Sequence, residues 1–285
     1  MLTLVDQEGG RVQRLRPPAW RQLPPAACYA HAAQELAAAA EQTRLVSRLV
    51  AEDLRAVGLN CNCTPVLDTP VSGAHGIIGD RALGSDAATI IAIGRAIAAG
   101  HLAGGVLPVI KHIPGHGRAT ADSHLELPRV DTPLAELVAT DFEPFQALAD
   151  LPAAMTAHIV FEAIDPDAPA STSNLATQRI IRDAIGFDGL LMSDDLSMRA
   201  LTGTMRTRAA AVISAGSDLA LHCNGELDEM VEVAESVPLL EGRSLQRFER
   251  ALAVTRRSEP FDREAAEACL VRILALPAAL WANIV

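Results

Sequence analysis

The side chains that can do chemistry are concentrated in one fourteen-residue segment, which begins at Lys111-His112 and ends at Asp122-Ser123-His124. Its two ends, Lys111–Gly117 and Asp122–His124, contain one cation, three imidazoles and a carboxylate. Imidazoles exchange protons near neutral pH, and carboxylates orient them by accepting hydrogen bonds. The apolar run before the segment and the glycines and proline within it indicate a loop at the C-terminal end of a strand. We therefore expect an active site in this loop.

Asp122 and His124 have the spacing of a carboxylate–imidazole pair. Side chains two residues apart in an extended loop can lie on the same side, so the aspartate can accept a hydrogen bond from one ring nitrogen. Such a bond fixes the tautomer and leaves the other nitrogen to give or take a proton. For an isolated Asp-x-His, an Asx turn with a solvated histidine is the simpler interpretation.

A second candidate group follows the apolar run Gly189–Ser193, where Asp194 and Asp195 are adjacent. The run is typical of a buried strand. Because successive residues of a strand point to opposite faces, only one of the two acids can face a site directly. The alternative is that both carboxylates cap the turn that follows.

A zinc site is the strongest competing chemistry. Four side chains could supply its nitrogen and oxygen ligands, namely His112, His116, Asp122 and His124. However, the sequence has no His-Glu-x-x-His motif, and Cys61 and Cys63 have no second cysteine pair at zinc-site spacing. We therefore expect neither a metal nor an organic cofactor.

Composition narrows the class of protein. The chain has 285 residues, 49% of them hydrophobic, and a formal net charge of -11. Binding to nucleic-acid phosphates needs a basic face, so we expect no nucleic-acid partner. Five cysteines without regular spacing favour a reducing compartment. The sequence shows no signal peptide and no apolar stretch long enough to cross a bilayer, so we expect a cytoplasmic location and no membrane partner.

Strand-like and helix-like segments alternate along the chain, which is typical of parallel α/β architecture. Strands are predicted at Leu2–Val5, Leu59–Val66, Val106–Lys111, Ala153–His158, Gly189–Ser193 and Leu219–His222. Helices are predicted at His31–Ala56, Asp86–Ala103, Pro133–Leu148 and Arg206–Ala215, with a further helical segment at about 262–285. The length and the lack of a low-complexity linker indicate one domain over residues 1–285.

Polar residues follow nearly every predicted strand: Asp6, Asp68, Lys111 with His112, His158, Asp194 and Asn224. In (β/α) barrels the site is built from loops at the C-terminal ends of the strands, whereas a doubly wound sheet concentrates ligands at one switch point. Contributions from six strands favour a TIM-type (β/α)8 barrel. Its last strand is the least distinct, and Ser236–Leu240 is a weak candidate for it.

Six segments together resemble the glycoside hydrolase family 3 β-N-acetylglucosaminidases of bacterial cell-wall recycling, and they occur in that family's order. They are Asp6 to Arg14, Pro65 to Asp68, Gly79 to Arg81, Lys111 to Gly117, Asp122 to His124, and Gly186 to Met198. The combination is highly specific, although no single segment is. The resemblance also implies a strand and a helix ahead of the strand that ends at Asp6, so we expect a barrel that lacks its first β/α unit.

The resemblance implies a role for each matched residue. Asp194 matches the nucleophile that forms a glycosyl-enzyme intermediate, and His124 matches the acid/base, which Asp122 holds. The residues that match the binding site of the N-acetylglucosamine ring are Asp6, Arg14, Arg81, Lys111 and His112. Supporting, pocket-lining or core roles are expected for Asp68, Asp195, His116 and His158.

The sequence and the resemblance together predict a retaining exo-β-N-acetylglucosaminidase. Its expected substrate is a small carbohydrate, a peptidoglycan fragment of the GlcNAc-1,6-anhydroMurNAc type, from which it removes terminal N-acetylglucosamine. A β-glucosidase is the nearest enzymatic alternative. A non-catalytic sugar-binding remnant and a metal-dependent barrel hydrolase are the alternatives from other classes.

Overall fold

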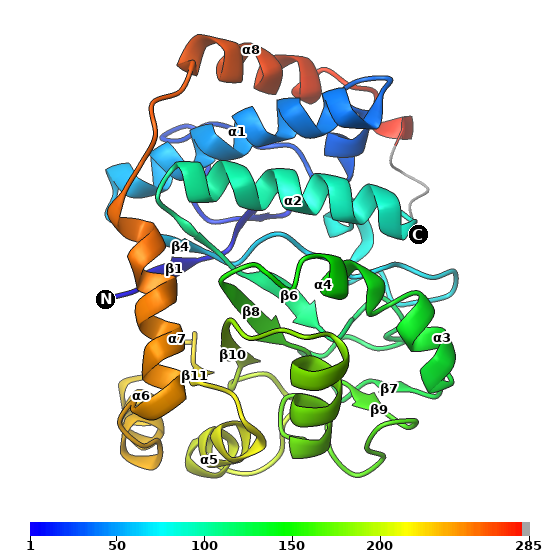
Figure 1. Cartoon of the computed structure of the whole chain (residues 1–285), viewed down its shortest axis with the longest axis vertical. Helices are drawn as coiled ribbons and strands as arrows, with labels where there is room; N and C mark the ends of the chain where they lie inside the picture. The colour runs from blue at the N-terminus through cyan, green and yellow to red at the C-terminus, as the bar shows by residue number, and fades with distance from the viewer. Residues whose placement is uncertain (281–285) are drawn as a thin grey trace.

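The computed structural model describes residues 1–280, and residues 281–285 lie outside the described part. At its centre is a set of parallel strands (Figure 1). A three-stranded group contains, in spatial order, β1 (Leu4–Val5), β4 (Cys61–Asn62) and β5 (Leu107–Pro108). A four-stranded group contains β11 (Leu219–Leu221), β10 (Leu190–Asp195), β8 (Ala153–Thr156) and β6 (Ile110–Ile113). Only Val109 separates β5 from β6, so the two groups form one continuous array.

The central strands carry apolar side chains on both faces, and both faces are buried. In β10, Leu190 and Met192 join one apolar cluster, whereas Leu191 between them packs into the main core with the helices. This is the period of two that strand geometry imposes. Near-continuous apolar runs, which the sequence shows at these positions, are expected for parallel strands that are covered on both sides.

Three helices stack on one side of the array (Figure 1): α1 (Leu36–Ala56), α2 (Ala87–Ala103) and α8 (Arg263–Leu274). Helices α1 and α2 approach each other closely at Gly100, where a Cβ atom would collide with the backbone carbonyl of Arg44. Helix α2 follows Asp86, whose carboxylate accepts a hydrogen bond from the backbone N–H of Thr89. This cap satisfies a donor that the first helical turn leaves free. Helix α8 lies within the segment 262–285 that was predicted to be helical.

The remaining elements connect or flank these. β2 (Gln7–Gly9) and β3 (Val12–Gln13) form an antiparallel hairpin, and β7 (Arg129–Val130) pairs with β9 (Val160–Phe161). The other helices are α3 (Leu134–Ala139), α4 (Glu143–Ala147), the π-helix η3 (Ala176–Ala184), α5 (Met205–Ala215), α6 (Leu227–Ser236) and α7 (Gly242–Ala253). Short 3-10 turns are η1 (Ala26–His31), η2 (Gly79–Arg81), η4 (Val254–Arg256) and η5 (Ala278–Leu280). None of the helices within residues 1–280 is long and apolar enough to cross a membrane.

Each of the six predicted strands overlaps an observed strand, but two predicted helices differ from the structure. The first begins at Leu36 rather than at His31, because the preceding turn η1 ends at His31. The predicted helix Pro133–Leu148 is divided into α3 and α4. Between them Thr140 donates its hydroxyl back to a carbonyl of α3 at 2.8 Å, and Pro144 cannot donate a helical N–H.

The sequence predicts a TIM-type (β/α)8 barrel that lacks its first β/α unit, and the described strands do not confirm a barrel because they do not close. β1 pairs with β4 alone and β11 with β10 alone, so the array of described strands is open between β1 and β11. The candidate last strand at Ser236–Leu240 is wrong, because α6 ends at Ser236 and the next four residues contain no strand. Pro238 in this segment lacks the N–H that a ladder needs. The α/β class and the parallel pairing of the central strands are confirmed.

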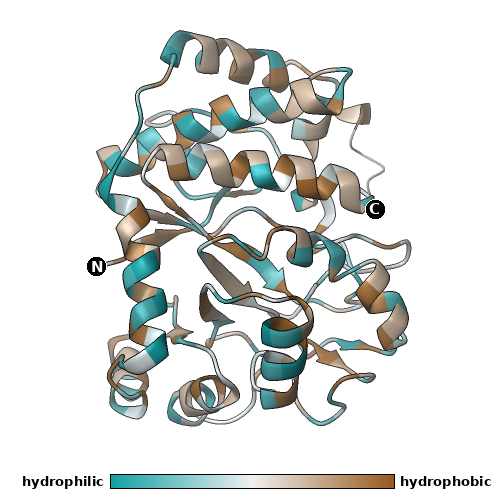
Figure 2. Ribbon diagram, viewed as in Figure 1, coloured by the Kyte–Doolittle hydropathy of each residue, from teal (hydrophilic) through white to brown (hydrophobic). Residues whose placement is uncertain are grey.

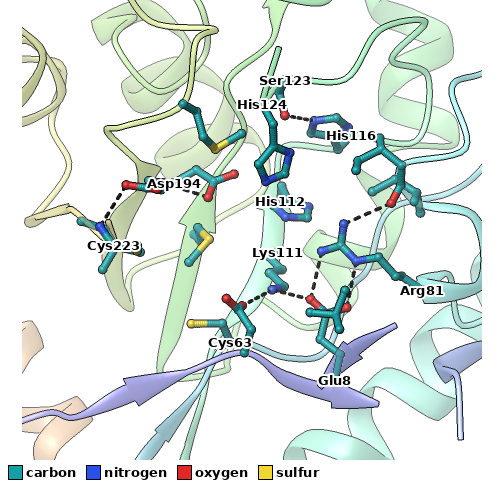
Figure 3. A pocket seen from close by; sticks show the side chains of 18 of the residues that line it. Glu8, Cys63, Arg81, Lys111, His112, His116, Ser123, His124, Asp194 and Cys223 are labelled. Carbon is teal, nitrogen blue, oxygen red and sulfur yellow. Dashed lines mark hydrogen bonds and ion pairs between the residues drawn. The ribbon is translucent and has the colours of Figure 1, made fainter. Parts of the chain in front are cut away.

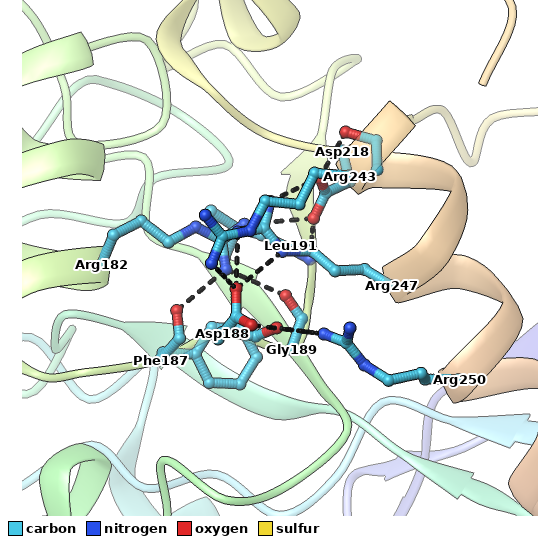
Figure 4. A network of polar contacts seen from close by, with 10 residues as sticks. Arg182, Phe187, Asp188, Gly189, Leu191, Asp218, Arg243, Arg247 and Arg250 are labelled. Carbon is cyan, nitrogen blue, oxygen red and sulfur yellow. Dashed lines mark hydrogen bonds and ion pairs between the residues drawn. The ribbon is translucent and has the colours of Figure 1, made fainter. Parts of the chain in front are cut away.

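Helix α7 packs against the apolar face of the array that α1 and α2 do not cover. Phe248 and Ala251 of α7, with Val254 after it, contact the same cluster as Leu190 and Met192. Figure 2 shows hydrophilic and hydrophobic residues alternating along this helix. Its polar side takes part in an ion-pair network of four arginines and two aspartates (Figure 4): Arg182, Arg243, Arg247, Arg250, Asp188 and Asp218.

Candidate active site

A cavity of about 360 Å³ opens at the C-terminal ends of the strands (Figure 3). It is lined by seven predicted site residues: Asp6, Arg14, Arg81, Lys111, His112, His124 and Asp194. The eighth, Asp122, is not in the lining but is hydrogen-bonded to His124. Loops from separate strands therefore bring residues from distant parts of the sequence to one place, as the parallel arrangement requires.

Asp194 lies near the end of β10, and one oxygen of its carboxylate accepts the backbone N–H of Asp195 at 2.8 Å. No other protein donor to this carboxylate is found in residues 1–280. Burial alone would raise the pKa of Asp194, but the neighbouring imidazoles of His112 and His158 and the N–H of Asp195 outweigh burial and hold that pKa below its usual value. The side chain is therefore an anion at neutral pH, with one oxygen available to a ligand.

Asp195 also borders the cavity, but its oxygens are already engaged. It accepts hydrogen bonds from the backbone N–H and hydroxyl of Ser197 and from the backbone N–H of Cys223, both N–H bonds being 3.0 Å long. The carboxylate thus joins the end of β10 to the segment after β11. The prediction that only one of the two acids faces a site therefore needs correction: both reach the cavity, and their hydrogen-bond partners distinguish them.

His124 and Asp122 form the predicted pair. The imidazole Nδ1 lies 2.8 Å from the Asp122 carboxylate, which also accepts the backbone N–H of His124 at 2.9 Å. The Asx turn and the carboxylate–imidazole pair, which the sequence presented as alternatives, therefore occur together. Burial would raise the pKa of Asp122, but the hydrogen bonds from His124 lower it. Nε2 of His124 has no hydrogen-bond partner among residues 1–280, and Figure 3 shows the ring directed into the cavity between Asp194 and His116.

His112 is held by Asp68, a fully buried carboxylate. The imidazole Nδ1 of His112 lies 2.7 Å from Asp68, and the backbone N–H groups of His112 and His116 donate to the other oxygen at 3.1 and 2.7 Å. Burial would raise the pKa of Asp68, but the His112 contact lowers it. Asp68 thereby fixes the start of the loop that carries His124, which is the supporting role predicted for it.

Glu8 is a buried residue of the site that the sequence analysis missed. Its carboxylate receives both nitrogens of an Arg81 fork at 2.9 Å each and the Lys111 ammonium at 2.6 Å. Lys111 also donates to Asp6 at 2.8 Å. Burial would raise the pKa of Glu8, but Lys111 and Arg81 outweigh it, so that pKa lies well below the usual value. The signal that could have revealed Glu8 is its position two residues after Asp6, at the start of the β2–β3 hairpin.

Two further arginines stand at the rim of the cavity. Arg14 is 59% exposed, and its guanidinium lies 3.8 Å from the Asp6 carboxylate. Arg11, which the sequence analysis did not single out, pairs with Asp80 at 3.0 Å and donates to three consecutive backbone carbonyls of residues 76–78. Arg11 therefore holds the loop that leads to Arg81, whereas Arg14 is available to a ligand.

The other side chains considered in the sequence analysis, His158 and the two cysteines of the β4 region, are buried in the protein interior. His158 is fully buried, with Nδ1 2.7 Å from the Ser171 hydroxyl and Nε2 3.1 Å from the carbonyl of Asp195. Cys61 and Cys63 are buried free thiols in or beside β4. Within residues 1–280 no group of three or more histidine, cysteine, aspartate or glutamate side chains is arranged to hold a metal ion.

The fold and the site together define the class, and comparison with known proteins agrees. The protein-family model for the glycosyl hydrolase family 3 N-terminal domain matches residues 1–254 of the sequence. The chain therefore belongs to this family. A beta-hexosaminidase of Methylococcus capsulatus is 43% identical over 228 residues, which cover 79% of this chain and 67% of that protein. The beta-hexosaminidase of Aromatoleum aromaticum is 33% identical over 93% of this chain and 75% of its own length.

Solved structures show the same relationship. NagZ from Neisseria gonorrhoeae, in complex with N-trifluoroacetyl-D-glucosamine, superposes with a TM-score of 0.80 at 30% identity, covering 99% of this chain and 81% of that one. A family 3 β-N-acetylglucosaminidase from Paenibacillus gives a TM-score of 0.81 at 27% identity, covering 96% and 55%. The chain spans roughly two thirds of the length of several of the curated relatives, between 64% and 67%.

Proposed function

We propose that the protein is an exo-acting β-N-acetylglucosaminidase. The observation that carries the proposal is that a carboxylate with an available oxygen, Asp194, and an imidazole with a free nitrogen, His124, border the same cavity from different loops. A glycosidase needs these two functions on either side of the bond that it breaks. The relatives named beta-hexosaminidase, and the one solved with an N-acylated glucosamine, support the choice of sugar.

We infer a retaining mechanism. Asp194 attacks the anomeric carbon and forms a glycosyl-enzyme intermediate, while His124 protonates the leaving oxygen; the same imidazole then removes a proton from the water that hydrolyses the intermediate. Asp122 holds the ring and stabilises the imidazolium that forms when the water is deprotonated. A histidine in this role avoids a second carboxylate beside Asp194, which would raise one of the two carboxyl pKa values.

The polar lining fits a ring that carries hydroxyl groups. Asp6 can accept hydrogen bonds, and Lys111, His112, Arg81 and Arg14 can donate them in fixed directions. Lys111 and Arg81 are held in place by Glu8, so their orientation is set before the sugar binds. We assign the sugar-binding role to these residues, with no metal or organic cofactor in the reaction.

The finer parts of the proposal concern substrate, location and architecture. We propose peptidoglycan fragments of the GlcNAc-1,6-anhydroMurNAc type as the substrate and the cytoplasm as the location. We also propose that residues 1–285 form one domain, and that its open array is a variant of the (β/α)8 barrel, because its polar residues gather at the C-terminal ends of parallel strands. The open array also keeps a non-catalytic sugar-binding protein as a second candidate, because the two strands that border the cavity, β1 and β11, each pair on one side only among the described strands.

Hydrolysis of chromogenic substrates tests the proposal. The purified chain should cleave an aryl β-N-acetylglucosaminide much faster than the matching β-glucoside, and Asp194→Asn should abolish turnover without unfolding the protein. His124→Ala should lose about 100-fold or more on a phenyl glycoside but far less on a 2,4-dinitrophenyl glycoside, because the second leaving group needs little protonation. Sugar binding without hydrolysis would establish the non-catalytic alternative, and an α-configured first product would exclude retention.

A further inference from the structure

His116 and Ser123 join the two ends of the loop that carries His124. The imidazole Nε2 of His116 lies 3.0 Å from the hydroxyl oxygen of Ser123, as Figure 3 shows. Both side chains are buried, with 3% and 2% of their surface exposed. The sequence analysis singled out His116 only as a pocket or core residue, and the mechanism proposed above uses neither side chain.

The burial of Ser123 contrasts with that of its neighbours. The side chains of Asp122 and His124 are 19% and 59% exposed, so the pair that would do the chemistry stands on the open side of the loop. Ser123 is buried, and its hydroxyl contacts His116 in the wall of the cavity, which both residues line. The loop is therefore attached to the body of the molecule through the residue between the two members of the pair.

His116 is a rigid partner for this attachment. Its backbone N–H donates to the buried Asp68 carboxylate at 2.7 Å, and its ring stands edge-on to His112 with 5.3 Å between the ring centres. The other ring nitrogen, Nδ1, has no hydrogen-bond partner in residues 1–280, so Ser123 is the partner that orients the ring. Burial, and after it the neighbouring His112 imidazole, lower the pKa of His116 to about 4, so the His116 ring is neutral near pH 7.

Backbone hydrogen bonds also hold this loop, among them a 2.8 Å bond from the N–H of His75 to the carbonyl of Ala119, before the Asp122–His124 pair. The backbone carbonyl of Ser123 accepts the N–H of Ala200 at 3.2 Å, and that of His124 accepts the N–H of Arg199 at 3.4 Å. Both bonds come from the segment after β10. The Ser123–His116 bond is shorter than these two, and it ties the loop to the end of β6.

We propose that the Ser123–His116 hydrogen bond is a latch that keeps the Asp122–His124 pair over the cavity. The two latch residues act through His124 and are positioning residues rather than catalytic ones. This inference depends on the acid/base role proposed for His124, because its kinetic consequence is a loss of proton donation to the leaving group. A latch of this kind also predicts a local effect on the loop that does not depend on any reaction.

Ser123→Ala, Ser123→Thr and His116→Phe test the latch. Ser123→Ala and His116→Phe should lower kcat about tenfold on a phenyl β-N-acetylglucosaminide, with little change in KM and a much smaller loss on the 2,4-dinitrophenyl substrate. Ser123→Thr keeps the hydroxyl and should restore the wild-type rate. The double variant Ser123→Ala/His116→Phe should be no slower than either single variant, because both remove one interaction. Equal losses on both substrates, or additive losses, would overturn the proposal.

Amide hydrogen exchange of residues 119–126 provides a measurement without substrate. Exchange should be faster in Ser123→Ala and His116→Phe than in the wild type, and unchanged in Ser123→Thr, with the thermal midpoints recorded alongside. Unchanged exchange in the two disruptive variants would refute the latch even if the enzyme is active. Conversely, a wild-type chain that hydrolyses neither substrate would refute the proposed function, while the exchange measurement still decides whether the latch exists.

Discussion

At the scale of single residues, Glu8 organises the cationic side of the cavity. Its carboxylate accepts three charge-assisted hydrogen bonds from Arg81 and Lys111, and only 2% of its side chain is exposed. If one member of a buried ion pair is removed, the remaining charge is left in the interior without compensation. The free energy lost in this way is larger than the net stabilisation that the intact pair provides. Glu8 therefore sets both the stability of this corner and the position of two cations that we assign to sugar binding.

We predict that Glu8→Gln lowers the free energy of unfolding by about 3–5 kcal/mol, because the buried Arg81 loses its carboxylate partner and Lys111 keeps only Asp6, which is 36% exposed. The KM for an aryl β-N-acetylglucosaminide should rise, since both cations then lose their fixed orientation. Glu41→Gln is the matched control: its side chain is 57% exposed in a pair with Arg44, and such pairs contribute less than about 1 kcal/mol. Urea denaturation and steady-state kinetics measure both effects, and equal losses in the two variants would contradict the argument.

The residues of the site differ in how far the sequence could reveal them. Asp122 and His124 are two positions apart, so their spacing offered the hydrogen bond between them as one of two interpretations, beside an Asx turn with a solvated histidine. Glu8 meets Arg81 across 73 positions, and no local pattern marks that contact. The different surroundings of Asp194 and Asp195 are likewise set by partners from elsewhere in the chain, such as Cys223.

At the scale of elements, an ion-pair network holds α7 against the array (Figure 4). Asp218 stands at its centre, with a side chain 1% exposed. It binds Arg182 and Arg247 at 3.1 Å each, and it also accepts the backbone N–H of Leu191 in β10 at 2.9 Å. Asp188 pairs with the same helix but is 52% exposed. The buried carboxylate therefore joins three elements, whereas the exposed one adds contacts at the surface.

Because of this difference, Asp218→Asn should destabilise the protein far more than Asp188→Asn. We expect the first to lose about 3–5 kcal/mol, since two arginines are left without their buried partner, and the second about 1 kcal/mol or less. Thermal or urea unfolding followed by circular dichroism measures the difference. Similar losses for the two variants would mean that the apolar contacts of Phe248 and Ala251, rather than the buried charge, hold α7 in place.

The sequence predicted some of the helices and strands correctly and others not. Alternating strand and helix patterns located the six central strands, because buried parallel strands read as apolar runs. The pair α6 and α7 was not predicted, and a strand was suggested at Ser236–Leu240 instead. A short apolar stretch cannot by itself distinguish a strand from a connection between helices. Packing of Phe248 against strands distant in sequence decided the outcome.

At the scale of the whole molecule, the cavity lies across the opening of the array. Its lining includes Val5 of β1 and Leu221 of β11, the two strands that do not pair with each other. The parallel order of the described strands follows from the alternation of strands and helices. Closure depends instead on pairing between the first and last strands, which no local pattern encodes. This is why the class could be predicted and the closed barrel could not.

The buried histidines make the whole molecule sensitive to acid. Burial lowers the pKa of His101 and of His116 to about 4, whereas an unfolded chain titrates near pH 6.5. Between these values the unfolded state binds protons that the folded state excludes, so the free energy of unfolding must decrease as the pH falls. The carboxylates of Glu8 and Asp68, whose pKa values are also lowered by their partners, extend the loss below about pH 4.

We therefore expect the free energy of unfolding to fall between pH 7 and pH 5 by about 2 kcal/mol for each of the two histidines. Urea denaturation at intervals of half a pH unit gives the slope, which reports the difference in bound protons. His101→Gln should reduce the slope by one proton even if it lowers stability at pH 7, because the slope depends on titration and not on packing. His75→Gln, at an exposed position, should leave it unchanged. A flat profile over this range would show that the folded protein accepts these protons, and that the two imidazoles are reached by water.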